Sequence, residues 1–232
     1  MKHLTVKQKL AVFSLAILAG FLYNSWPLGY VVNPVITAQH GLASELGAPG
    51  QPWWWLFDVL DVVASLLVIW VAALLWRAVK AKHQWFKIGM VSYTIFAVLT
   101  IVDALLPLNC QPTAKNCGPI IHNPLLITHG VSSIAAAMAL FVSAVALWQL
   151  VRVSGLKYLH SVMIIILVGW ALFGIISALF LLYPGPGYLA QHYFITLCSI
   201  WIALVPFVAI RSTRLETVPD LSVPQEENQL QA

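Results

Sequence analysis

The 232-residue sequence is 60% hydrophobic and only 9% charged, whereas a soluble domain carries about 25% charged residues. This composition excludes a soluble globular domain and indicates a chain that folds in a lipid bilayer, with membrane lipids as its partners. The formal net charge of +4 does not indicate a nucleic-acid partner, because the basic residues form short clusters between apolar runs.

Six apolar segments are long enough to cross a bilayer, which requires about 20 residues of helix. They predict an all-α polytopic membrane protein, with six transmembrane helices in one bundle within residues 1–212. The predicted spans are 10–30, 53–76, 85–106, 124–151, 158–183 and 189–210. The first span contains Asn24, Pro27 and Gly29 near its end, so we expect that end to be irregular. Residues 213–232 are polar and are predicted to form a disordered tail.

The Lys and Arg residues indicate how the chain is oriented. Of the 12, only Lys115 lies in a loop on one side of the predicted membrane; the others precede the first span, follow the sixth, or flank the second–third and fourth–fifth loops. Cytoplasmic segments carry an excess of Lys and Arg. Both termini are therefore predicted to be cytoplasmic, in a multi-pass protein of the cell membrane.

The stretch Gly41–Asp61 combines a loop rich in glycine and proline with the start of the second span. Three consecutive tryptophans, at 53–55, form the kind of aromatic cluster that marks a membrane–water interface. The helix then carries Asp58 and Asp61 into the membrane, where an Asp at the helix centre costs about 2.5–3.5 kcal/mol. The two aspartates are therefore expected to have a compensating partner or a function.

Other polar residues are predicted at the same outer end of the bundle. Asp103 ends the third span, where the helix dipole disfavours a negative charge, so we expect a partner such as His129 or His192. The candidates for a ligand or proton site are Glu45, Asp58, Asp61, Asp103, His129, His192, Asn24 and Ser25. Structural interpretations stay open beside this one: Asp58 as a helix-end charge, and His129 as an interhelical hydrogen bonder.

Two kinds of chemistry use such residues. A metal site takes imidazole nitrogens and carboxylate oxygens, for which Asp103, His129 and His192 are the candidates. Proton or solute transport uses Asp and His at membrane depth. The sequence contains no His-Glu-x-x-His, Walker, Gly-x-Ser-x-Gly or Cys-x-x-Cys motif. No catalytic residue and no cofactor are therefore predicted, with a metal kept as the alternative.

The three cysteines differ in their surroundings. Cys110 and Cys117 flank a short loop after the third span, and they predict a disulfide if that loop faces an oxidising compartment. Cys198 lies in an apolar run and is expected to be a small core residue.

Two segments resemble a known family: Tyr23–Pro34, reading YNSWPLGYVVNP, and Ser44–Asp61, reading SELGAPGQPWWWLFDVLD. They are similar to the signature of bacterial six-helix membrane proteins catalogued only as a domain of unknown function. More distantly, the Ser-Glu/Asp-x-Gly loop before an aromatic helix is similar to the DRAM and Sfk type of membrane protein. The resemblance implies six spans in a bacterial inner membrane with the glycine/proline loop outside, and it implies no established activity.

These observations predict an integral membrane protein, without catalytic chemistry, that binds a lipid head group or a small polar ligand at its outer-leaflet Asp/His cluster. A purely structural or assembly role stays open beside two functional alternatives. One is an intramembrane metal-dependent hydrolase that uses Asp103, His129 and His192, with Ser25 as a further candidate. The other is a proton-coupled transporter of small solutes that uses Asp61 and Asp103. The sequence leaves the ligand, the helix packing order and the oligomeric state open.

Overall fold

The computed structural model describes residues 5–34, 41–79, 83–106, 108, 110, 123–182 and 187–215. Its long helices are α1 (Val6–Tyr23), α4 (Trp54–Ala78), α5 (Gln84–Leu105), α6 (Pro124–Val153), α7 (Lys157–Leu182) and α8 (Gly187–Leu215). The short elements are the 3-10 helices η1 (Trp26–Leu28) and η2 (Ala43–Gly47) and the one-turn helix α2 (Gly29–Val32). No strand occurs in these ranges.

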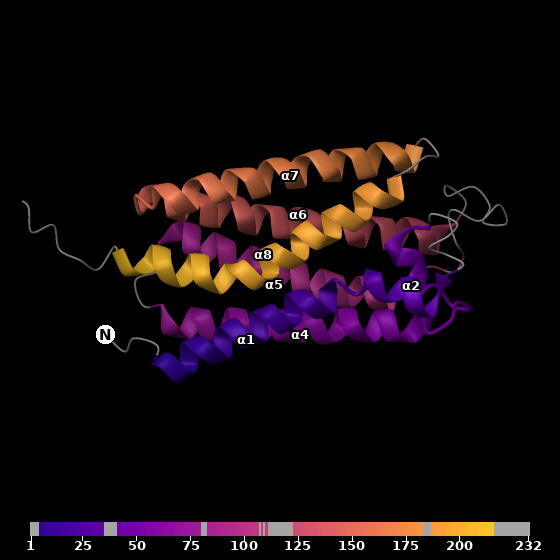
Figure 1. Cartoon of the computed structure of the whole chain (residues 1–232), viewed down its shortest axis with the longest axis horizontal. Coiled ribbons are helices and arrows are strands. Elements are labelled where there is room, and N and C mark those ends of the chain that lie inside the picture. The colour runs from indigo at the N-terminus through magenta and orange to yellow at the C-terminus, as the bar shows by residue number, and fades with distance from the viewer. Residues whose placement is uncertain are drawn as a thin grey trace, which may run out of the picture.

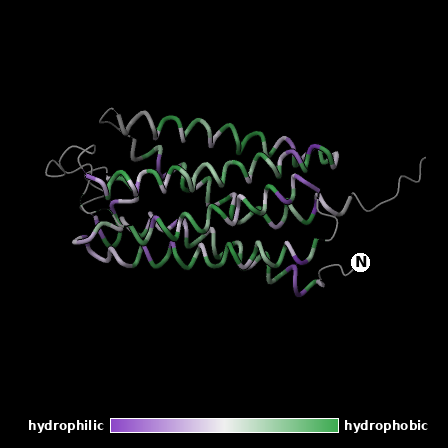
Figure 2. The backbone as a smooth tube through the Cα atoms, turned by 180° about the vertical axis from the view of Figure 1, so that it is seen from behind, coloured by the Kyte–Doolittle hydropathy of each residue, from purple (hydrophilic) through white to green (hydrophobic). Residues whose placement is uncertain are grey.

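Six of these helices are long and apolar enough to cross a membrane. They lie side by side in one elongated bundle, and α1 begins at the same end at which α8 finishes (Figure 1). The middle of the bundle is mainly hydrophobic, and polar residues gather toward its two ends (Figure 2). The predicted all-α fold with six spans is therefore confirmed, while the orientation of the termini in a membrane stays a prediction.

The long helices form a closed ring. Each packs against the next along the chain, and α8 returns to pack against α1. The last helix also contacts α4 and α6 and crosses the bundle obliquely (Figure 1). Of the six spanning segments, the one in α8 has the largest buried share. The core is thus built around α8, as the chain order alone does not indicate.

A glycine allows α1 and α8 to approach closely. A Cβ added to Gly20 would lie 2.5 Å from the backbone oxygen of Ser199 and 3.4 Å from the Cβ of Ala203. Small residues at such points let membrane helices bring their backbones together. The contact that closes the ring therefore requires glycine at position 20.

A proline inside α8 creates a second specific contact. Pro206 has no N–H, so the carbonyl of Ile202, four residues earlier, has no backbone donor. The hydroxyl of Tyr93 on α5 donates to that carbonyl at 3.1 Å, and Tyr93 is fully buried. Because an unsatisfied backbone group costs several kcal/mol inside a membrane, this hydrogen bond both satisfies α8 and joins it to α5.

The helix ends differ from the predicted spans mainly at the first and last helices. The first span was predicted to reach Tyr30, but α1 ends at Tyr23, where Asn24 is the C-cap and η1 and α2 follow. The reason is Pro27, which has no N–H for the Tyr23 carbonyl and whose ring would clash with it. At the other terminus α8 continues to Leu215, and residues 216–232 of the predicted tail lie outside the described ranges.

Replacing Tyr93 by Phe should lower the free energy of unfolding by about 1–3 kcal/mol, because the Ile202 carbonyl loses its donor. In a Pro206→Ala background the restored backbone N–H bonds that carbonyl, so Tyr93→Phe should cost at least about 1 kcal/mol less. Equilibrium unfolding in mixed detergent micelles measures both values. Tyr158→Phe, at a side chain that is 81% exposed, is the control. An equal cost in the two backgrounds would contradict the pairing of Tyr93 with the proline gap.

Candidate functional site

The described charged side chains are separated between the two ends of the bundle. The basic ones lie where α1, α5 and α7 begin and where α4, α6 and α8 finish, and we call this the basic end: Lys7, Lys9, Arg77, Lys87, Arg152, Lys157 and Arg211. The acidic ones lie at the opposite end, the acidic end: Glu45, Asp58, Asp61 and Asp103. The acidic end therefore has no Lys or Arg among the residues whose side chains are described.

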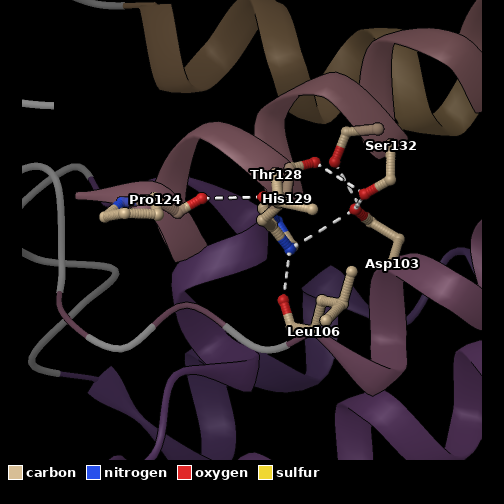
Figure 3. A network of polar contacts seen from close by, with 7 residues as sticks. Asp103, Leu106, Pro124, Thr128, His129 and Ser132 are labelled. Atoms are coloured by element: carbon tan, nitrogen blue, oxygen red, sulfur yellow. Dashed lines mark hydrogen bonds and ion pairs between the residues drawn. The ribbon is translucent and has the colours of Figure 1, made fainter. Parts of the chain in front are cut away.

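Asp103, near the end of α5, is held by side chains of α6 (Figure 3). Its Oδ1 accepts a hydrogen bond from Ser132 Oγ, and its Oδ2 accepts one from Ser133 Oγ at 2.8 Å. His129 Nδ1 lies 3.4 Å from Oδ1. Of the two predicted partners of Asp103, His129 is therefore confirmed. Side chains of α6 stabilise the negative charge that the helix dipole at the end of α5 disfavours.

The imidazole of His129 is held in one orientation. Its Nδ1 lies 3.0 Å from the backbone oxygen of Leu106, which can only accept, so Nδ1 carries a proton (Figure 3). Its Nε2 is buried and has no hydrogen-bond partner within the described part of the chain.

Asp58 and Asp61 lie about one turn apart on α4, and both are half-buried. Within the described ranges, no hydrogen bond or ion pair reaches either carboxylate. Both lie within electrostatic reach of Asp103, and Tyr23 at the end of α1 is within reach of Asp61 and Asp103. Polar side chains of α1, α4 and α5 therefore converge at the acidic end, as the sequence could not establish.

The two segments that carry the family resemblance pack against each other. Leu46 of η2 forms a small hydrophobic cluster with Phe57 of α4, against which Trp26 packs. Asn33 Nδ2 donates to Gln51 Oε1 at 2.9 Å. Residues 23–34 and 44–61 thus form one unit over the acidic end.

The loop around η2 is buried and tied to two helices. Glu45 is 0% exposed, and its Oε2 accepts from the backbone N–H of Leu42 at 3.2 Å. The backbone N–H of Ala43 donates to Gln191 Oε1 on α8 at 2.8 Å. A Cβ added to Gly47 would lie 2.5 Å from Asp58 Oδ1, so the missing side chain of Gly47 makes room for this carboxylate. Glu45 thus lies buried within the loop and accepts a hydrogen bond from the loop's own backbone, and its part in a ligand site stays a prediction.

A second polar cluster joins α8 to the end of α1. The rings of His192 and Trp26 are stacked, with centroids 4.4 Å apart and an interplanar angle of 6°. Trp26 Nε1 donates to Thr196 Oγ1 at 3.2 Å, and Thr196 Oγ1 lies 3.1 Å from Asn24 Oδ1. His192 and Asn24, both predicted site residues, therefore meet here. Ser25 is the N-cap residue of η1 and makes no side-chain cap bond.

The candidate metal ligands are divided between the two clusters. Asp103 and His129 lie together, whereas His192 is stacked on Trp26. Among the described residues, no three His, Cys, Asp or Glu side chains are grouped so that they could hold a metal ion. The arrangement expected for the metal-dependent hydrolase is thus not assembled by these residues.

Sequence reasoning missed Ser132, Ser133, Thr196 and Tyr23. Helical spacing could have indicated two of them, because Ser132 follows His129 by three residues and Thr196 follows His192 by four. Tyr23 gave no such signal, since its role depends on which helix faces meet.

The predicted disulfide between Cys110 and Cys117 stays a prediction, because Cys117 lies outside the described residues. Cys198 is a free, buried cysteine, and its Sγ lies 3.0 Å from Nε1 of Trp170. The expectation that Cys198 belongs to the core is therefore confirmed.

The six apolar helices and the buried polar contacts between them define a polytopic helical membrane protein. The family described as "Protein of unknown function (DUF998)" matches residues 14–209, and the chain belongs to this family. The match includes both segments of the acidic end, Tyr23–Pro34 and Ser44–Asp61, and confirms the resemblance drawn from them. No curated protein and no solved structure matches the chain. The similarity to DRAM and Sfk type proteins stays a prediction.

Replacing Ser133 by Ala should lower the free energy of unfolding by about 1–3 kcal/mol, because Asp103 Oδ2 loses its donor in a partly buried site. The matched control is Ser161→Ala on α7, where an exposed hydroxyl is 3.4 Å from its own helix backbone and the change should stay within about 0.5 kcal/mol. Thermal or denaturant unfolding in detergent measures both. Equal effects of the two substitutions would show that the serine does not stabilise Asp103.

Proposed function

We propose that this integral membrane protein has no catalytic chemistry and binds a lipid head group or a small polar ligand at the acidic end. The observation that carries the proposal is the pair Asp58 and Asp61 on α4. Both are half-buried, neither has a hydrogen bond or ion pair in the described part of the chain, and both lie within electrostatic reach of Asp103. A carboxylate in such surroundings is expensive unless something pairs with it.

The depth of these residues favours a ligand at the level of lipid head groups. Asp61 is seven residues after the start of α4, which corresponds to about 10 Å along the helix axis. Trp53 and Trp55 at the same helix start are 55% and 49% exposed. Exposed tryptophans of this kind lie at the membrane–water interface, so a head group could reach Asp58 and Asp61 from the surface.

Transport has less support than binding. A proton or ion path would need ionisable or hydrated groups along the bundle axis. Beyond Asp61 toward the basic end, the buried side chains of the described residues are mainly apolar. The polar groups among them include the hydroxyls of Ser65, Thr100 and Ser143. The described residues therefore provide no continuous series of ionisable groups from Asp61 to the basic end, and this favours binding at the acidic end over transport.

The test compares lipid binding by the wild type and by Asp61→Asn, using native mass spectrometry of the purified protein with phosphatidylethanolamine, phosphatidylglycerol and phosphatidylcholine. We expect at least one lipid to bind the wild type, and Asp61→Asn to weaken that lipid at least about tenfold, equivalent to about 1.4 kcal/mol. Asp220→Asn makes the same substitution near the C-terminus and serves as the control. Unchanged affinity in Asp61→Asn would contradict the proposal.

We also propose that the basic end faces the cytoplasm and the acidic end the outside of the cell membrane. The support is the gathering of described Lys and Arg side chains at one end, as expected of the cytoplasmic side. A fluorescent protein fused to the C-terminus should be bright, and alkaline phosphatase fused there should be inactive. Phosphatase fused after residue 110 should be active instead. The reverse pattern would overturn this orientation.

A further inference from the structure

On α4, the polar side-chain atoms without partners among the described residues share one property: each can accept a hydrogen bond. Besides the Asp58 and Asp61 carboxylates, Ser65 Oγ, about one turn deeper along α4, is buried at 1% exposure and has no partner within the described ranges. Ser65 follows Asp61 by four residues, so the two side chains are neighbours on one face of α4.

The distribution of charge also indicates what kind of group the site would bind. Asp103 is partly compensated by two serine hydroxyls and His129, and Glu45 by its own loop. Asp58 and Asp61 receive no comparable contact, and the described Lys and Arg side chains are all at the basic end. The described residues therefore bring no positive group to Asp58 and Asp61. A positive group bound there would be strongly stabilised, because charges interact strongly where water is scarce.

We infer that the ligand of the acidic end carries an ammonium group, which binds between the carboxylates of Asp58 and Asp61 above the hydroxyl of Ser65. This inference rests on the proposed function and names its ligand class. An ammonium group supplies a positive charge and only hydrogen-bond donors, and it therefore complements every unpartnered acceptor at this site.

Other ligand classes fit less well. A phosphate or carboxylate would meet Asp58, Asp61 and Asp103 at close range and be repelled. A divalent metal would need about three protein ligands, and the described residues bring no such group together. An ammonium group is carried both by the phosphatidylethanolamine head group and by free primary amines such as ethanolamine, so the experiment must separate these two sources.

The experiment uses the purified full-length protein and four probes. Native mass spectrometry compares phosphatidylethanolamine with its N-acetyl derivative, which lacks the ammonium group, and with phosphatidylglycerol. Thermal unfolding compares ethanolamine hydrochloride with sodium chloride at equal concentration. We expect phosphatidylethanolamine to bind at least about tenfold more tightly than either other lipid, or ethanolamine to raise the unfolding temperature, in the wild type and in Asp61→Glu.

Two further variants locate the site. Asp61→Asn should abolish the preference for the amine, and Ser65→Ala should weaken binding several-fold while leaving the unfolding temperature without ligand near that of the wild type. An effect of phosphatidylethanolamine alone assigns the ammonium to a lipid, and an Asp61-dependent effect of ethanolamine assigns it to a free amine.

The outcomes separate this inference from the proposed function. Asp61-dependent binding of phosphatidylglycerol, or of the N-acetyl derivative with equal affinity, would overturn the ammonium ligand and leave the proposed binding site intact. If no lipid and no amine binds in an Asp61-dependent way, both are wrong.

Discussion

Inside a bilayer, a polar group can form hydrogen bonds only with the protein itself, and the rest of this structure depends on that constraint. It explains why a tyrosine of α5 bonds the carbonyl left open by Pro206, and why two serines of α6 hold the carboxylate of Asp103. The first contact joins helices that are far apart in the sequence, and the second joins two consecutive long helices. Polar satisfaction thus specifies which helices meet, whereas the apolar surfaces alone do not distinguish one neighbour from another.

The sequence predicted the six helices because long apolar runs between short charged loops are a strong signal. Pro27 and Gly29 indicated an irregular end to the first span, but not that the α-helix ends as early as Tyr23, whose carbonyl faces the proline without an N–H donor. The site was predicted only as a set of residue types at one depth. The pairing of Asp103 with His129, and the separation of His192 from both, follow from the order of helices around the ring, which no periodicity encodes.

The acidic end shows how the family resemblance and the chemistry coincide. The segments 23–34 and 44–61, which carry the resemblance, are in contact through Trp26, Leu46 and Phe57. The second of them also supplies Asp58 and Asp61, the two carboxylates that no described residue bonds or pairs with. Apolar contacts and negative charge are therefore found in the same part of the chain.

The ring arrangement also has a consequence for biosynthesis. The chain is made from its N-terminus, so α1 enters the membrane first and α8, which fills the interior and packs on α1 at Gly20, is made last. Until then α1, α4, α6 and α7 lack the helix that packs against each of them, and the Tyr93 hydroxyl of α5 has no Ile202 carbonyl to bond. The ring of helices can therefore close only after α8 has been made and has packed against both α7 and α1.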